Sequence, residues 1–231
     1  MTDLPWLLFV GASLVVIMTP GQDMLLVLSR GLSTGARAGL ATAAGLGVGT
    51  LVHTVVAAFG VGALIVASSL VFTVLKVMSA AYLAWLGLSA IRGARANAQA
   101  IVARVGGEAV AGGAVGEIQS TRTSTTTFAD LRRSFLQGLI ANVTNPKVAI
   151  FFLAFVPQFV AADTTAPVVD TLRLGVLFMG LAVGVKGGVA LLAGAISTWI
   201  SRMPGVLTWL NRVSGSVLIA LGVGLLFETR P

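Results

Sequence analysis

Long apolar blocks decide what this chain can fold into. Each block runs over 20 or more residues, and at about 1.5 Å per residue a helix of that length crosses roughly 30 Å of hydrocarbon. Stretches such as 7–18 and 148–156 lack the alternation of apolar and polar residues that membrane β-barrel strands show. We therefore predict an all-α membrane protein with about six transmembrane helices, at residues 4–28, 39–66, 69–91, 134–160, 174–200 and 206–227.

The composition agrees with this class, since 56% of the residues are hydrophobic and only 10% are charged. In soluble domains about a quarter of the residues are charged. The chain has no cysteine and a single histidine, His53. No disulfide, thiolate metal site or multi-histidine metal site is therefore expected. No nucleotide-binding motif is present, and we expect neither a cofactor nor an enzymatic activity.

Basic residues outside the predicted spans gather in alternate connections. By the positive-inside rule these connections face the cytoplasm, which places both termini of a six-span chain outside. The net charge of +7 is then a topology signal, and no nucleic-acid partner is expected. The alternate connections and the C-terminal end contain only Arg173 and Arg230. The cytoplasmic connections contain Arg30, Arg37, Arg92, Arg95, Arg104, Arg122, Arg132, Arg133 and Arg202.

The longest connection divides the chain into two halves. Residues 93–133 are rich in Gly, Ala, Ser and Thr and are predicted to form a flexible cytoplasmic linker. A plain tether and a regulatory segment both remain open as roles for it. The first three-helix half is 1–92 and the second is 134–231. Because three is odd, halves of the same fold would be inverted relative to each other.

The first span of each half contains a proline motif that predicts a broken helix. The motifs are Met-Thr-Pro-Gly-Gln-Asp at 18–23 and Asn-Val-Thr-Asn-Pro-Lys at 142–147. Proline in a helix interior removes one backbone hydrogen bond and clashes with the preceding turn. Pro20 lies 10 residues before Arg30 and Pro146 lies 13 after Arg133, about 15 and 20 Å along a helix. Two breaks near the middle of the bilayer are typical of a transporter binding site, although kinks that only shape packing are the alternative.

Ionisable residues lie near these breaks and favour a binding site. Asp23 follows the first break, Lys147 follows the second, and His53 and Lys186 lie midway along their spans. A charge at this depth costs about 2.5 kcal/mol or more, so it normally faces a cavity or a partner. Asp23 is expected to pair with Lys147 or Lys186, and His53 and Lys186 are possible coupling or cavity-lining residues.

Each of these residues also has a purely structural interpretation. Asp23 is also compatible with capping its half-helix, Lys147 with a structural partner of Asp23, Lys186 with a packing ion pair, and His53 with a hydrogen-bonded core histidine. The half-helix after each break directs its N-terminal amides toward the middle of the membrane, where they suit a carboxylate. The half-helix before each break directs its C-terminal carbonyls toward the same place, where they suit an ammonium. The predicted substrate-binding residues are Thr19, Pro20, Gly21, Gln22, Asp23, Asn142, Asn145, Pro146 and Lys147.

Glycines recur at four-residue intervals in the second and fifth predicted spans. Such spacing lets helix backbones approach closely. Packing within the fold, a homo-oligomer contact and a sliding surface are the three interpretations. The glycines concerned are Gly45, Gly49, Gly180, Gly184 and Gly188.

Two motifs in this chain resemble the LysE/RhtB family of bacterial amino-acid exporters. The first is Thr-Pro-Gly-Gln-Asp at 19–23 followed by Leu-Ser-Arg-Gly-Leu at 28–32, with Gly35 and Arg-Ala-Gly at 37–39. The second is Gln-Gly at 137–138 with Asn142, Asn-Pro-Lys at 145–147, Phe-Phe at 151–152 and Phe-Val-Pro-Gln-Phe at 155–159. The similarity covers nearly the whole chain. Family members often have Pro or Asn in place of Gln22, and the linker is locally extended.

The resemblance implies a secondary exporter of amino acids or related zwitterions, driven by a proton or other ion gradient. Its partners would be the amino acid, the coupling ion and lipid of the bacterial inner membrane. The alternatives are an ion or metal exporter of similar build, a membrane enzyme and a non-transporting assembly subunit. The lack of cysteine argues against soft metals and against an enzyme that passes reducing equivalents through paired thiols. An assembly subunit would not need four ionisable groups in the middle of the membrane.

Overall fold

The computed structural model describes residues 4–67, 69–103, 107, 126–160, 164–202 and 204–227. Helices are the regular secondary structure in these ranges. A helical segment Ala94–Ala103 follows α4, and the π-helix η1 (Phe151–Phe155) and the 3-10 helix η2 (Val156–Phe159) continue α7. The α-helices are α1 (Leu4–Met18), α2 (Gln22–Ser33), α3 (Ala36–Ala67), α4 (Ser69–Arg92), α6 (Phe128–Val143), α7 (Pro146–Ile150), α8 (Pro167–Leu191), α9 (Ala193–Arg202) and α10 (Pro204–Phe227).

Up to six membrane spans are present in the described residues. The helices α3, α8 and α10 are each long and apolar enough to cross a bilayer. Three bent helix pairs add to them: α1 with α2 at 58°, α4 with the segment Ala94–Ala103 at 63°, and α6 with the segment that runs from α7 to η2 at 52°. This arrangement agrees with the predicted class of all-α membrane protein.

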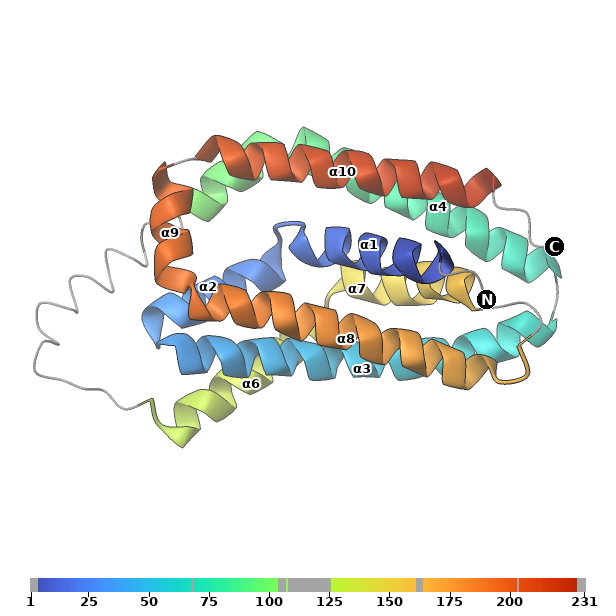
Figure 1. Cartoon of the computed structure of the whole chain (residues 1–231), viewed down its shortest axis with the longest axis horizontal. Coiled ribbons are helices and arrows are strands. Elements are labelled where there is room, and N and C mark those ends of the chain that lie inside the picture. The colour runs from blue at the N-terminus through green and yellow to red at the C-terminus, as the bar shows by residue number, and fades with distance from the viewer. Residues whose placement is uncertain are drawn as a thin grey trace, which may run out of the picture.

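The helices are arranged around α1 and α7, which lie in the middle of the bundle. In Figure 1, α4 and α10 run side by side along one side of the molecule and α3 and α8 along the other, with α1 and α7 between them. Helix α6 packs on the outer side of α3, and α2 packs on α3 and α8. Within the two proline motifs, Thr19, Asn142 and Asn145 are buried in protein, where irregular backbone is tolerated at membrane depth.

Glycines allow two of the closest helix crossings. A Cβ on Gly45 of α3 would collide with the Phe135 carbonyl of α6, and a Cβ on Gly138 of α6 would collide with the Thr42 carbonyl of α3. Gly87 of α4 and Gly215 of α10 meet in the same reciprocal way. The glycine interval at Gly45 and Gly49 therefore serves packing within the fold. On α8, by contrast, a Cβ would meet no atom within 4 Å at Gly180, Gly184 or Gly188.

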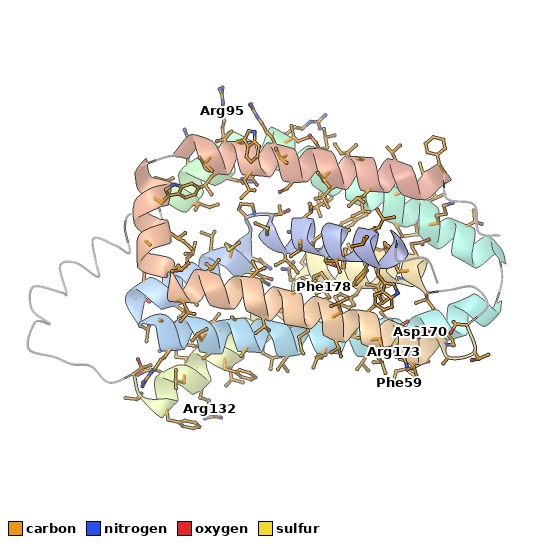
Figure 2. The ribbon with its side chains drawn as sticks, in the orientation of Figure 1. Phe59, Arg95, Arg132, Asp170, Arg173 and Phe178 are labelled. Carbon is orange, nitrogen blue, oxygen red and sulfur yellow. The ribbon has the colours of Figure 1, made fainter. Side chains whose placement is uncertain are left out.

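The outer surface of the helices is apolar, as a lipid environment requires. Phe59 on α3 is 67% exposed and points away from the bundle (Figure 2). Trp85, Trp209 and Ile140 are exposed in the same way on α4, α10 and α6. The inside is filled by an aromatic cluster made by Phe9, Phe151, Phe152, Phe155, Phe159 and Phe178.

The fifth span has other boundaries in the structure than the sequence predicts. The prediction is 174–200, but α8 ends at Leu191 and α9 crosses the end of the bundle as a separate helix (Figure 1). The physical reason lies at the other end: Pro167 at the first turn starts α8 earlier than predicted, and its 25 residues already suffice to cross.

The predicted linker 93–133 is helical at both ends. The segment Ala94–Ala103 is a helix, and α6 begins at Phe128 behind a capping box. In that box Thr127 Oγ1 accepts from the Asp130 amide at 3.2 Å, and Asp130 Oδ2 accepts from the Thr127 amide at 3.0 Å. Residues 104–106 and 108–125, on which the prediction of flexibility mainly rests, lie outside the described residues.

Candidate functional site

The first helix break lies between Met18 and Gln22. Helix α1 ends in a turn in which the Thr19 hydroxyl donates to the Val15 carbonyl at 2.6 Å. Gly21 then takes an extended conformation and serves as the N-cap of α2, without a side-chain cap. Asp23 stands in the first turn of α2, where the helix dipole favours a negative charge.

The second break lies between Val143 and Pro146. Pro146 occupies the first turn of α7, where its missing N–H costs nothing. The cap is Asn145, whose Oδ1 accepts from the Lys147 amide at 3.0 Å. The following η1 segment is a π-helix, closed by the Val156 amide on the Phe151 carbonyl. Such segments are frequent at functional sites.

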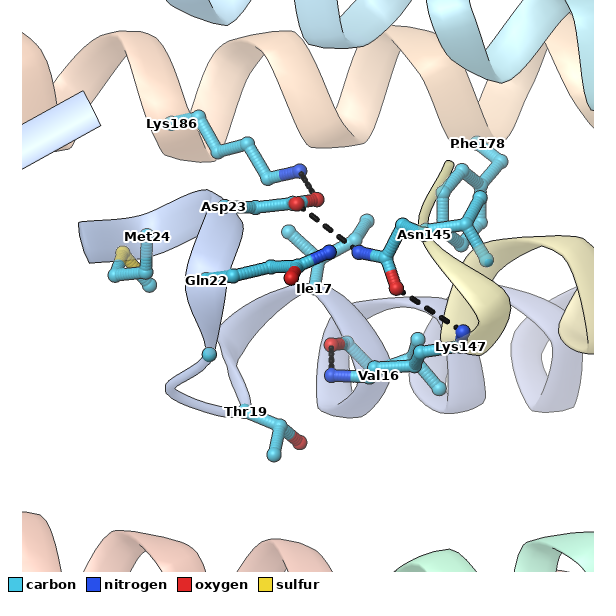
Figure 3. A pocket seen from close by; sticks show the side chains of 12 residues that line it. Val16, Ile17, Thr19, Gln22, Asp23, Met24, Asn145, Lys147, Phe178 and Lys186 are labelled. Atoms are coloured by element: carbon cyan, nitrogen blue, oxygen red, sulfur yellow. Dashed lines mark hydrogen bonds and ion pairs between the residues drawn. The ribbon is translucent and has the colours of Figure 1, made fainter. Parts of the chain in front are cut away.

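A cavity of about 80 Å³ lies between the two breaks (Figure 3). That volume holds several water molecules. Its walls come from α1, the first break, α2, the second break, α7 and α8. The lining residues are Val16, Ile17, Thr19, Gly21, Gln22, Asp23, Met24, Asn145, Lys147, Val148, Phe178 and Lys186.

Asp23 is the centre of the polar network in this cavity. Its Oδ2 accepts from Lys186 Nζ of α8 at 2.8 Å, and its Oδ1 accepts from Asn145 Nδ2 at 3.0 Å. The side chains of Lys186 and Asp23 are only 6% and 12% exposed, so solvent screens this ion pair weakly. The second helix break thus holds Oδ1 of Asp23 through Asn145, and α8 holds Oδ2 through Lys186.

Lys147 does not pair with Asp23 but binds the other broken helix. Its Nζ donates to the Val16 carbonyl at 2.8 Å, one of the last carbonyls of α1, which have no partner within their own helix. Within the described residues no carboxylate lies at ion-pair distance from the Lys147 ammonium. The site therefore contains one neutralised positive charge, on Lys186, and one that a further anion would neutralise.

His53 and Asn142 form a separate contact beside the site. His53 Nε2 donates to the Asn142 carbonyl at 3.0 Å, and its ring stacks on Phe152. Asn142 is 1% exposed, and its Nδ2 has no hydrogen-bond partner among the described residues. Neither residue lines the cavity. His53 thus fixes the end of α6 where the second break begins.

The structure brings most of the predicted binding residues together. Pro20 and Pro146 lie in the breaks without lining the cavity, and Asn142 and His53 lie next to it. The predicted residues that line the cavity are Thr19, Gly21, Gln22, Asp23, Asn145, Lys147 and Lys186.

Sequence reasoning missed the apolar part of the cavity wall. Phe178 lies eight residues before Lys186 on α8, a separation that places both on one helix face, so the helical period from Lys186 would have found it. Met24 and Val148 each follow a predicted site residue directly. Val16 and Ile17 belong to the last turn of α1 before the break.

Comparison with known proteins gives one family. Residues 14–229 match the model of the LysE type translocator. A homoserine/homoserine lactone efflux protein of Salmonella typhimurium is 29% identical over 217 residues, 94% of this chain and 93% of that protein. A leucine efflux protein of Enterobacter sp. is 32% identical over 160 residues, 69% of this chain and 65% of that protein.

Another relative, described as an uncharacterized membrane protein of Vibrio cholerae, is 30% identical over 226 residues, 97% of this chain and 96% of that protein. No solved structure matches the chain. The family match extends over both helix breaks and over every residue that lines the cavity. The chain therefore belongs to the family of LysE type translocators.

Proposed function

We propose that this protein is a secondary transporter that exports amino acids or related small zwitterions across the bacterial inner membrane, coupled to a proton or other ion gradient. Two of the relatives named above are described as efflux proteins, one for homoserine and homoserine lactone and one for leucine, which supports this class of substrate. The observation that carries the proposal is the cavity between two helix breaks, which contains both a carboxylate and ammonium groups.

A zwitterion matches the charges of this cavity. Asp23 is the only carboxylate among the lining residues and would bind the substrate ammonium. Lys147, which has a carbonyl rather than a carboxylate as its partner, would bind the substrate carboxylate. Asn145 keeps Asp23 in place, and Thr19, Gly21 and Gln22 form the polar wall beside it.

The apolar wall would receive the substrate side chain. Phe178 lies on one side of the polar network (Figure 3), and Ile17, Met24 and Val148 belong to the same cavity. No second carboxylate is present among the lining residues to bind a cationic side chain. The cavity therefore favours neutral amino acids over lysine and arginine.

Alternating access would arise from two inverted halves that move around this site. The packing supports an internal two-fold relation: α3 packs on α8 and α4 on α10, and each pair joins corresponding helices of the two halves. The broken first spans then meet at the axis, where the cavity lies.

Efflux from loaded vesicles tests the function. Right-side-out membrane vesicles or proteoliposomes are loaded with a mixture of the 20 standard amino acids and L-homoserine, a pH gradient with the acidic side outside is imposed, and the released compounds are identified by mass spectrometry. We expect vesicles that contain the protein to release neutral amino acids faster than protein-free vesicles do. Vesicles that release no amino acid faster than protein-free vesicles would contradict the proposal.

Variants at the cavity test the site. Asp23→Asn and Lys147→Ala should each reduce efflux at least tenfold at near-normal membrane abundance, because each removes one substrate contact. The double variant should stay inactive, whereas recovery in the double variant would contradict a substrate clamp. Asp170→Asn is the matched control: Asp170 pairs with Arg173 at 3.0 Å in the first turn of α8, remote from the cavity, and this variant should keep normal efflux.

A further inference from the structure

The ion pair of Lys186 with Asp23 occupies the position that a substrate ammonium needs. Asp23 Oδ1 is held by Asn145, and Oδ2 is held by Lys186 at 2.8 Å. A substrate ammonium in the cavity therefore competes with Lys186 for Oδ2. Lys186 is 5% exposed, so once it is displaced it lacks a counter-ion and is poorly solvated.

Binding of a zwitterionic substrate changes which charges in the cavity are paired. The empty cavity contains one negative side chain, Asp23, and two positive ones, Lys147 and Lys186. The unpaired positive charge of the empty cavity is Lys147, whose Nζ donates to the Val16 carbonyl. A zwitterion adds one charge of each sign and moves the unpaired positive charge to Lys186, which has no such carbonyl partner among the described residues. A buried charge without a partner is strongly unfavourable, and such a group neutralises instead. Loss of one proton leaves two complete pairs.

Lys186 is the group whose partner is taken away. Lys147 keeps the Val16 carbonyl and gains the substrate carboxylate, so binding favours its charged form. Lys186 loses Asp23, the only partner that it has among the described residues. The proton therefore leaves from Nζ of Lys186.

No other charged group on the neighbouring helices replaces Asp23. Arg30 of α2 donates to Gln137 of α6, and His53 of α3 donates to the Asn142 carbonyl. The described residues of α1 and η2 contain no charged side chain. The remaining charged residues on helices packed against α8 are at helix ends, Arg37 in α3 and Arg202 in α9.

We propose that Lys186 carries the coupling proton of the exporter, through competition with the substrate ammonium for Asp23. This rests on the proposed function. On the cytoplasmic side the substrate binds, and the Lys186 ammonium becomes an amine as its proton passes to cytoplasmic water. On the outer side the substrate leaves, and the amine takes a proton from external water and pairs with Asp23 again. One proton enters for each amino acid that leaves, and no covalent bond other than N–H changes.

The small number of lysines allows a direct test. The chain contains three lysines, Lys76, Lys147 and Lys186. Purified protein in nanodiscs, labelled with ¹³C-lysine, should give three sets of side-chain NMR signals. Single Lys→Arg variants assign them by the signal that each removes, and Lys186 is assigned by elimination if its own variant fails to fold. The ligands are L-leucine and L-homoserine at saturating concentration.

We expect the Lys186 signal to change from that of an ammonium to that of an amine on ligand binding, while the signals of Lys147 and Lys76 remain those of ammonium groups. A change at Lys147 in place of Lys186, or no change in the presence of bound ligand, would overturn the proposal. Absence of ligand binding, measured with radiolabelled L-leucine and L-homoserine, contradicts instead the proposed function.

Proton release gives a second readout. In weakly buffered solution with a pH-indicator dye, the unmodified protein should release about one proton per bound amino acid, and its association constant should rise about tenfold per pH unit. Lys186→Arg keeps a permanent charge and should release none. Lys76→Arg is the matched control and should release the proton normally. Equal proton release by Lys186→Arg and the unmodified protein would overturn the proposal.

Discussion

Asn145 donates a hydrogen bond from its Nδ2 to Oδ1 of Asp23 across 3.0 Å, which connects the second broken span directly to the first. The same side chain caps α7 through its Oδ1. One residue therefore shapes the second break and orients the carboxylate that we propose as the ammonium site. The two breaks are for this reason parts of one site.

Replacing Asn145 separates these two roles. Asn145→Ala removes the cap and the bond to Asp23, and we expect a loss of about 1–2 kcal/mol in stability and a strong loss of efflux. Asn145→Ser keeps a capping oxygen on a shorter side chain, and should recover most of the stability but not the efflux. Thermal unfolding in detergent and efflux from proteoliposomes measure the two effects. Normal efflux by Asn145→Ala would show that Asp23 needs no orientation by Asn145.

The crossing of α3 and α6 predicts which glycines tolerate a methyl group. Gly45→Ala places Cβ against the backbone of Phe135 and Leu139, and Gly138→Ala does the same against Thr42. We expect each to cost about 1–3 kcal/mol through overpacking and to lower the membrane abundance several-fold.

Gly184→Ala is the control for this prediction, since a Cβ there has nothing within 4 Å. Its abundance, measured by fluorescence-detected size-exclusion chromatography, should stay normal. A similar loss in all three variants would mean that the glycines act through backbone flexibility and not through close contact.

The spans and the two proline motifs could be predicted from the sequence because hydrophobic length and proline chemistry are local properties. The partner of Asp23 could not, since Lys147 and Lys186 are equally plausible from their positions in the chain. The choice depends on how α8 is rotated relative to α2, and packing along the whole length of α8 fixes that rotation. The mixed apolar wall of Val16, Met24 and Phe178 depends on the same relative rotations.

Glycines at four-residue intervals do not all pack against another helix in this protein. Gly45 and Gly180 stand in similar four-residue patterns, but only Gly45 faces another helix. A pattern identifies a small helix face and does not identify what lies opposite. The predicted end of the fifth span is wrong for a related reason, because apolar residues continue through Leu192 into α9 without marking the turn.

The proposed topology predicts the accessibility of two connections. In Figure 1 the segment Ala94–Ala103 ends, and α6 begins, at one end of the bundle, whereas α1 begins and α10 ends at the other. Arg95 and Arg132 lie in the part of the molecule near the first end, and Arg173, which pairs with Asp170, lies near the second (Figure 2). By the positive-inside rule we predict that the first end is cytoplasmic.

Single cysteines measure this topology cleanly, because the chain has none of its own. A cysteine in place of Thr165, in the connection before α8, should react with a membrane-impermeant thiol reagent in intact cells. A cysteine in place of Gly113 should react only after the membrane is opened. The reverse pattern of labelling would mean that the protein is inserted in the opposite orientation.

The charge count of the cavity predicts that export is electrogenic. With the substrate bound and Lys186 deprotonated, the charges of the cavity sum to zero. The empty cavity has one negative and two positive side chains and returns inward with one net positive charge. A membrane potential that is negative inside should therefore accelerate net efflux, because one positive charge enters per exported amino acid.

Exchange of amino acid for amino acid provides an internal control for this prediction. In exchange only the loaded, neutral form crosses the membrane, so the rate should not depend on the potential. Proteoliposomes with potassium gradients and valinomycin set the potential, and radiolabelled L-leucine or L-homoserine measures both net efflux and exchange. If exchange proceeds but the rate of net efflux does not change with the membrane potential, the empty cavity returns without its extra charge. Lys186 would then not return as an ammonium, because the return of that ammonium beside Lys147 and Asp23 is what gives the empty form its positive charge.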